Sequence, residues 1–81
     1  METRIAIIGI IVEDIDATGE INDILHDYGM YVIGRMGIPY RERNVNIISI
    51  VLDAPDDVIN ALGGKIGRVK GVSSKTIYSK I

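Results

Sequence analysis

Two short runs of β-branched residues, forty positions apart, constrain the fold of this chain more than any other feature of its sequence. Residues 5–12 read IAIIGIIV and residues 45–52 read VNIISIVL, and both runs have the length and residue types of a strand. Acidic residues follow each run, and apolar residues at helical spacing come next, which predicts an amphipathic helix after each strand. The chain therefore consists of two similar halves.

Glycines mark where the predicted helices end and where two further strands begin. Gly29 precedes the strand candidate 30–38, and Gly71 precedes the strand candidate 72–79. The apolar helix positions are Ile21, Ile24, Leu25, Tyr28, Val58, Ile59, Leu62, Ile66 and Val69. Right-handed crossovers place the first and third strands in the middle of an antiparallel sheet, with both helices on one face. We therefore predict a ferredoxin-like α+β sandwich, with a four-stranded antiparallel sheet, as a single domain over residues 1–81.

The two central strands of this predicted sheet are apolar on both faces. A sheet that has helices on one face and water on the other is expected to alternate apolar and polar residues. The alternate sets are Ala6, Ile8, Ile10 and Val12 against Ile5, Ile7 and Ile11, and Ile48, Ile50 and Leu52 against Val45, Ile47 and Val51. A monomer rarely exposes a large contiguous apolar patch, so we predict a homodimer or a higher even oligomer. The alternative, a lipid-binding face, is less favoured because no basic amphipathic helix accompanies it.

Composition excludes several classes of protein. A chain this short buries only about 60% of the surface that its unfolded form exposes, which favours support from a partner chain. The absence of cysteine excludes a disulfide framework, a thiolate metal site and a cysteine nucleophile. The apolar amino-terminal stretch is too short for a membrane span and lacks a signal cleavage site, so we expect a cytoplasmic protein without membrane contact. A formal net charge of -2 disfavours nucleic-acid binding by the chain alone.

Candidate metal ligands and acid–base residues have simpler explanations. His26 is the only histidine, and no cysteine or second histidine can complete a metal site with it, so we interpret it as a solvated helix residue. Carboxylates at helix starts are expected from capping and from the helix dipole. The acidic residues concerned are Glu13, Asp14, Asp16, Asp53, Asp56 and Asp57, with Asp14 or Asp16 as the predicted cap of the first helix. We therefore predict no catalytic residue, no metal and no cofactor.

The glycine-rich segment 63–67, GGKIG, is not a phosphate loop. The Walker pattern requires Ser or Thr directly after the lysine, and Ile66 stands there. Glycine inside a helix costs about 1 kcal/mol relative to alanine. We therefore expect either close packing of this helix on the sheet or access for a partner.

Residues 34–44, GRMGIPYRERN, form the one candidate ligand site. Pro39 and Asn44 are typical of a turn between the second and third strands. Guanidinium groups bind carboxylates and phosphates through two hydrogen bonds at once. The predicted ligand-binding residues are Arg35, Tyr40, Arg41 and Arg43. The alternative is that these arginines face solvent or pair with acidic groups of a neighbouring subunit.

Residues 35–76 carry motifs that resemble a known family. The motifs are Arg35-x-Gly37-x-Pro39-x-Arg41 and Leu62-x-Gly64-Lys65-x-Gly67, followed by Gly71-Val72 and Lys75. Over nearly the whole chain, the sequence resembles the small proteins described as regulators of the iron-only hydrogenase system. That family is similar in fold to ACT domains and to the carboxyl-terminal domain of the nickel-responsive repressor. The resemblance implies a module that forms oligomers and binds small effectors, although the repressor's histidine and cysteine nickel ligands are missing here.

We therefore expect a non-enzymatic regulatory or accessory domain that acts through homo-oligomerisation, with a small anionic effector and a protein partner. One alternative is a small enzyme whose active site forms between subunits, with carboxylates or His26 as acid or base. The other is nucleic-acid binding by a basic surface that several subunits assemble. Its residues would be Lys65, Arg68, Lys70, Lys75 and Lys80.

Overall fold

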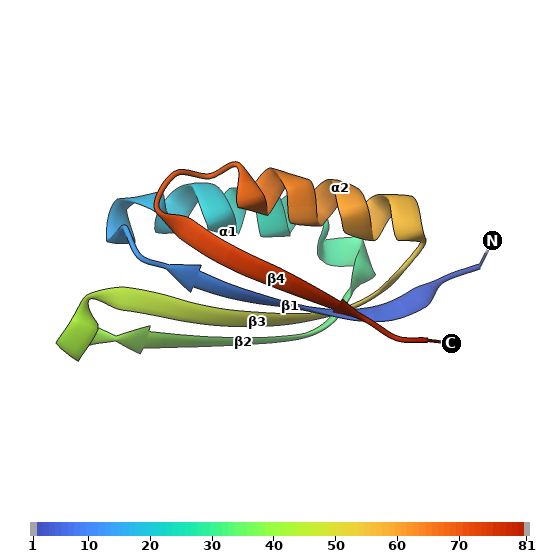
Figure 1. The fold of residues 1–81 in the computed structure, drawn as a ribbon, viewed down its shortest axis with the longest axis horizontal. Helices are drawn as coiled ribbons and strands as arrows, with labels where there is room; N and C mark the ends of the chain where they lie inside the picture. The colour runs from blue at the N-terminus through green and yellow to red at the C-terminus, as the bar shows by residue number, and fades with distance from the viewer. Residues whose placement is uncertain (1, 81) are drawn as a thin grey trace.

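The structure, a computed structural model, describes residues 2–80 as a four-stranded antiparallel sheet with two helices on one face (Figure 1). The strands are β1 (Arg4–Val12), β2 (Val32–Tyr40), β3 (Val45–Ala54) and β4 (Val72–Tyr78). The helices are α1 (Thr18–Asp27) and α2 (Asp56–Gly67), and the short 3-10 turns are η1 (Ile15–Ala17), η2 (Gly29–Tyr31) and η3 (Arg41–Arg43). The strand order is β2-β3-β1-β4, so the first and third strands lie in the middle. The predicted ferredoxin-like α+β arrangement is confirmed.

The hydrophobic core lies between the sheet and the two helices. Alternate residues of β1 and β3 point into it, because successive side chains of a strand point to opposite faces. Its buried members on the strands and helices are Ala6, Ile8, Ile10, Val12, Ile48, Ile50, Leu52, Ala54, Ile21, Leu25, Ile59, Leu62 and Ile66. The predicted apolar side of each helix is thus the side that packs on the sheet.

The helix ends differ in detail from the sequence prediction. Asp14 Oδ1 accepts a hydrogen bond from the Asp16 backbone N–H at 3.0 Å, so Asp14 caps the 3-10 turn η1 rather than α1. The second helix ends at Gly67, before Val69 rather than after it. The chain tightens there, because the Val69 backbone N–H donates to Ile66 O, three residues back, at 3.1 Å. Val69 is nevertheless buried in the core.

Two glycines let neighbouring elements approach closely. A Cβ atom on Gly63 of α2 would lie 3.3 Å from the Thr76 hydroxyl oxygen of β4, so close packing on the sheet explains this helix glycine. Gly71 has a φ of +82°, and a Cβ atom there would lie 2.5 Å from the Asp14 Cβ atom. The Gly71 carbonyl accepts hydrogen bonds from the backbone N–H groups of Glu13 and Asp14 at 2.8 and 3.0 Å. The turn before β4 is thereby joined to the end of β1.

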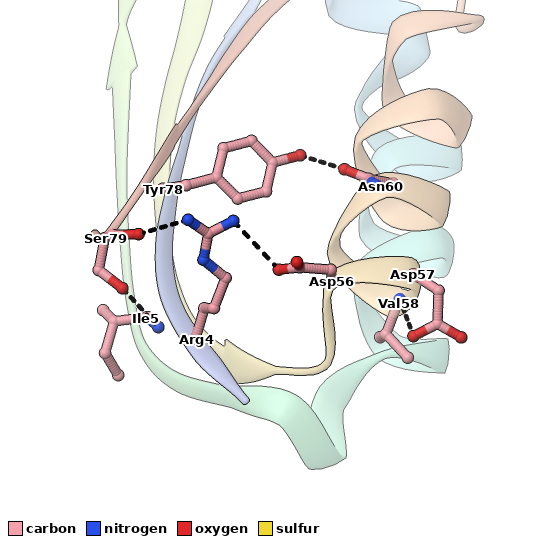
Figure 2. A network of polar contacts seen from close by, with 8 residues as sticks. All are labelled: Arg4, Ile5, Asp56, Asp57, Val58, Asn60, Tyr78 and Ser79. Carbon is pink, nitrogen blue, oxygen red and sulfur yellow. Dashed lines mark hydrogen bonds and ion pairs between the residues drawn. The ribbon is translucent and has the colours of Figure 1, made fainter. Parts of the chain in front are cut away.

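Arg4 ties together β1, β4 and the start of α2 (Figure 2). Its Nη2 donates to the Ser79 carbonyl oxygen at 2.8 Å, and its Nη1 lies 3.3 Å from Asp56 Oδ1. The guanidinium carbon is 5.3 Å from the centre of the Tyr78 ring, within the range of a cation–π contact. The Tyr78 hydroxyl in turn donates to Asn60 Oδ1 on α2. These contacts fix one end of the sheet to the helix layer.

Candidate interaction surface

The face of the sheet opposite the helices is apolar, and no element of residues 2–80 covers it (Figure 1). We call this surface the open face. Its apolar residues are Ile5, Ile7 and Ile11 of β1, Met36, Ile38 and Tyr40 of β2, Val45, Ile47 and Val51 of β3, and Ile77 of β4. Ile7 is 40% exposed and Ile77 is 67% exposed. The prediction that the central strands are apolar on both faces is therefore confirmed.

Strand pairing arranges the open face in rows that run across the sheet. The rows, from the β2–β3 turn to the opposite end, are Tyr40–Val45, Ile38–Ile47–Ile11–Ser73, Met36–Ser49–Gly9–Lys75, Gly34–Val51–Ile7–Ile77 and Asp53–Ile5. Gly9 stands in the middle row, where no side chain fills the space between its neighbours. A shallow hollow of about 460 Å³ is found there, and Ser49, Ser73 and Lys75 contribute its polar groups.

The two ends of the open face differ in charge. A hollow of about 480 Å³ beside the β2–β3 turn is lined by Tyr40, Arg43 and Glu13. Glu13 accepts a hydrogen bond from the Ser73 hydroxyl at this end. At the opposite end, Asp53 lies beside Ile5, and within residues 2–80 its carboxylate makes no hydrogen bond or ion pair. The face thus carries an arginine near one end and an unpaired carboxylate at the other.

The four residues predicted to bind a ligand do not form one cluster. Arg35 is paired with Ile50, a core residue, so it points to the helix side, where its Nη2 donates to Asn22 Oδ1 at 2.6 Å. Tyr40 belongs to the open face. Arg41 and Arg43 lie in the turn η3. Arg41 lines one hollow with Tyr40, and Arg43 lines a different hollow with Tyr40. Anion binding by these residues stays a prediction, and Arg35 is on the wrong face to share an anion with Tyr40.

The other candidate residues are spread over the surface. His26 is exposed on α1. Among residues 2–80, no group of three or more His, Cys, Asp or Glu side chains is placed to hold a metal ion. No helix in the described part of the chain is long and apolar enough to cross a membrane. The sequence pattern assigns Asp53 only to the start of a helix, whereas the structure places it on the open face without a hydrogen bond or ion pair within residues 2–80.

The sheet order, the two helices on one face and the apolar open face define a ferredoxin-like α+β module. The chain belongs to the TM1266-like family, described as "Iron-only hydrogenase system regulator, putative", whose model matches residues 4–76. The family resemblance inferred from the sequence is confirmed.

Solved structures agree with this assignment. The uncharacterized protein TM1266 from Thermotoga maritima is similar with a TM-score of 0.93 and 41% identity, over 98% of this chain and 100% of that chain. A formyltetrahydrofolate deformylase from Pseudomonas putida KT2440 is similar with a TM-score of 0.65 and 15% identity, over 90% of this chain and 28% of that chain. The second likeness shows the fold alone. No curated protein matches the sequence.

Proposed function

We propose that this protein is a non-enzymatic regulatory module that works by pairing with a second copy of itself through the open face. The family description supports the regulatory role and names the iron-only hydrogenase system as its setting. The observation that carries the pairing is the exposed apolar surface of the open face, which only the middle row of Ser49, Gly9 and Lys75 interrupts. Contiguous apolar patches of this kind mark protein–protein contacts, because their removal from water is favourable.

The size of the open face fits a pair of small proteins. Four strands lie about 4.8 Å apart, and the rows together span about 27 Å along the strands. The flat area of the open face is therefore about 500 Å² per copy. Two stacked copies would remove at least about 1,000 Å² from water, which reaches the lower limit for a specific interface. A second copy is the fitting occupant, because an isologous pair covers both apolar faces at once.

Charge introduced into the open face tests this pairing. The variant Ile7→Glu places a carboxylate in a row of apolar side chains, and burial of that carboxylate against a second copy would be costly. The matched control is Ala61→Glu, at an exposed position of α2 on the other side of the molecule. Sedimentation velocity is expected to show an even oligomer for the unmodified chain and for Ala61→Glu, and a folded monomer for Ile7→Glu. A monomeric unmodified chain would refute the proposal.

A small anion is the effector that we propose for this module, bound beside the β2–β3 turn, where it would compete with pairing because the hollow is part of the open face. Tyr40 and Arg43 line the same hollow, and Arg43 offers a guanidinium group, whereas the Tyr40 hydroxyl donates to Glu42 Oε2 at 3.1 Å. Glu13 lines it too, so its carboxylate weakens the attraction for an anion. Dianions such as phosphate are therefore the suitable probes.

Thermal unfolding in phosphate tests this effector site. At matched ionic strength, phosphate in place of chloride is expected to raise the Tm of the monomeric variant Ile7→Glu and of its control, Ile7→Glu with Arg68→Ala, because a ligand that binds the folded state stabilises it. The Tm of Ile7→Glu with Arg43→Ala is expected to be the same in phosphate and in chloride. An equal rise in all three proteins would show that the anion acts elsewhere.

A further inference from the structure

We infer that the second copy stacks on the open face with each strand antiparallel to the same strand of the first copy. Arg43 of each copy then faces Asp53 of the partner subunit. This inference rests on the proposed pairing and adds its orientation. For two sheets whose strands are aligned, two symmetric stackings are available. A two-fold axis between the faces can run along the strands or across them.

The rows of the open face define what each stacking brings together. An axis across the strands, through the middle row of Gly9, places the row of Ile11 over the row of Ile7 of the partner subunit. The end row that contains Tyr40 then lies over the end row that contains Asp53. An axis along the strands instead places each row over the same row of the partner subunit, so that β3 of one copy lies over β1 of the other.

The unpaired carboxylate of Asp53 favours the axis across the strands. With the axis along the strands, Asp53 would lie over Ile5 of the partner subunit, and a buried carboxylate without a partner is costly. With the axis across the strands, Asp53 lies near the partner's β2–β3 turn, where Arg43 borders the open face. The long arginine side chain can span the roughly 10 Å between packed sheets.

The antiparallel stacking also agrees with the size of the facing side chains. Ile38 would lie over Gly34 of the partner subunit, so a large side chain meets a position without one. The two copies of Lys75 would lie over one another. Because β4 is an edge strand and Lys75 is exposed, their ammonium groups can extend past the edge into water.

Charge reversal tests the orientation. The single variants Arg43→Asp and Asp53→Arg are each expected to weaken self-association by about tenfold, and the double variant is expected to restore it to within about threefold of the unmodified chain. The comparison pair is Arg43→Asp with Glu13→Arg, since an axis along the strands exchanges β3 with β1 and would place Glu13, which follows β1, over the β2–β3 turn of the partner subunit. Each dissociation constant would be measured by sedimentation equilibrium.

The outcomes separate this inference from the proposed function. If Asp53→Arg restores the self-association of Arg43→Asp and Glu13→Arg does not, the result supports the antiparallel stacking. Restoration by Glu13→Arg alone, or no restoration by either, overturns it. If Ile7→Glu still dissociates the oligomer in those cases, the pairing through the open face stands and only its orientation is wrong. If Ile7→Glu has no effect, the pairing itself is wrong.

Discussion

Among single residues, Gly71 is the position where the backbone leaves least room for a side chain. Its φ of +82° and the 2.5 Å approach to the Asp14 Cβ atom both oppose a larger residue. Gly71→Ala is therefore expected to lower the free energy of unfolding by about 2 kcal/mol. Urea unfolding followed by circular dichroism would measure the change.

Gly67 provides the control for this substitution. It lies in the last turn of α2, and a Cβ atom there would have no neighbour within 4 Å. Gly67→Ala is expected to raise the free energy of unfolding by about 0.5–1 kcal/mol, because alanine loses less backbone entropy on folding. Equal destabilisation by both variants would show that the strain at Gly71 is not the cause.

The candidate site shows what could not be predicted at this scale. The basic stretch 34–44 indicated that Arg35 and Tyr40 act together. They are five positions apart in one strand, and an odd separation places side chains on opposite faces. The sequence predicts a strand that ends at residue 38 and places Tyr40 in the turn, so this alternation does not extend to Tyr40. The unpaired state of Asp53 depends on which groups the fold brings near, which no local pattern contains.

At the scale of elements, the Arg4 contacts predict an unequal effect of two substitutions. Arg4→Ala removes the hydrogen bond to Ser79 O and the contact with the Tyr78 ring, and is expected to cost about 1–2 kcal/mol. Asp56→Ala removes an ion pair whose side chains are 37% and 59% exposed and a carboxylate from the first turn of α2, and is expected to cost about 1 kcal/mol or less. Chemical denaturation of both variants would compare them. A larger loss for Asp56→Ala would contradict the assignment of the main role to Arg4.

Strands and helices were predictable because their patterns are long and periodic. The two isoleucine-rich runs and the helical spacing of residues such as Leu25 and Leu62 correspond to β1, β3, α1 and α2. The exact ends of the helices could not be predicted in this way, because they depend on contacts between elements. Capping of η1 by Asp14 is local, but the end of α2 before Val69 follows from how the chain turns towards β4.

At the scale of the whole molecule, the proposed pairing predicts a stability that depends on protein concentration. A ligand that binds only the folded state stabilises it, and in the proposed pairing the ligand is a second copy. The Tm of the unmodified chain is therefore expected to rise with protein concentration, whereas that of Ile7→Glu is expected to stay constant. Differential scanning calorimetry over a hundredfold concentration series would compare the two. A constant Tm for both proteins would indicate that folding does not involve a partner.

Native mass spectrometry of the unmodified chain tests the central claim most directly, because it counts the subunits that stay together and detects retained small molecules. An open face that pairs with its own copy predicts a dimer or a higher even oligomer. A chain that stays monomeric at micromolar concentration would contradict the claim.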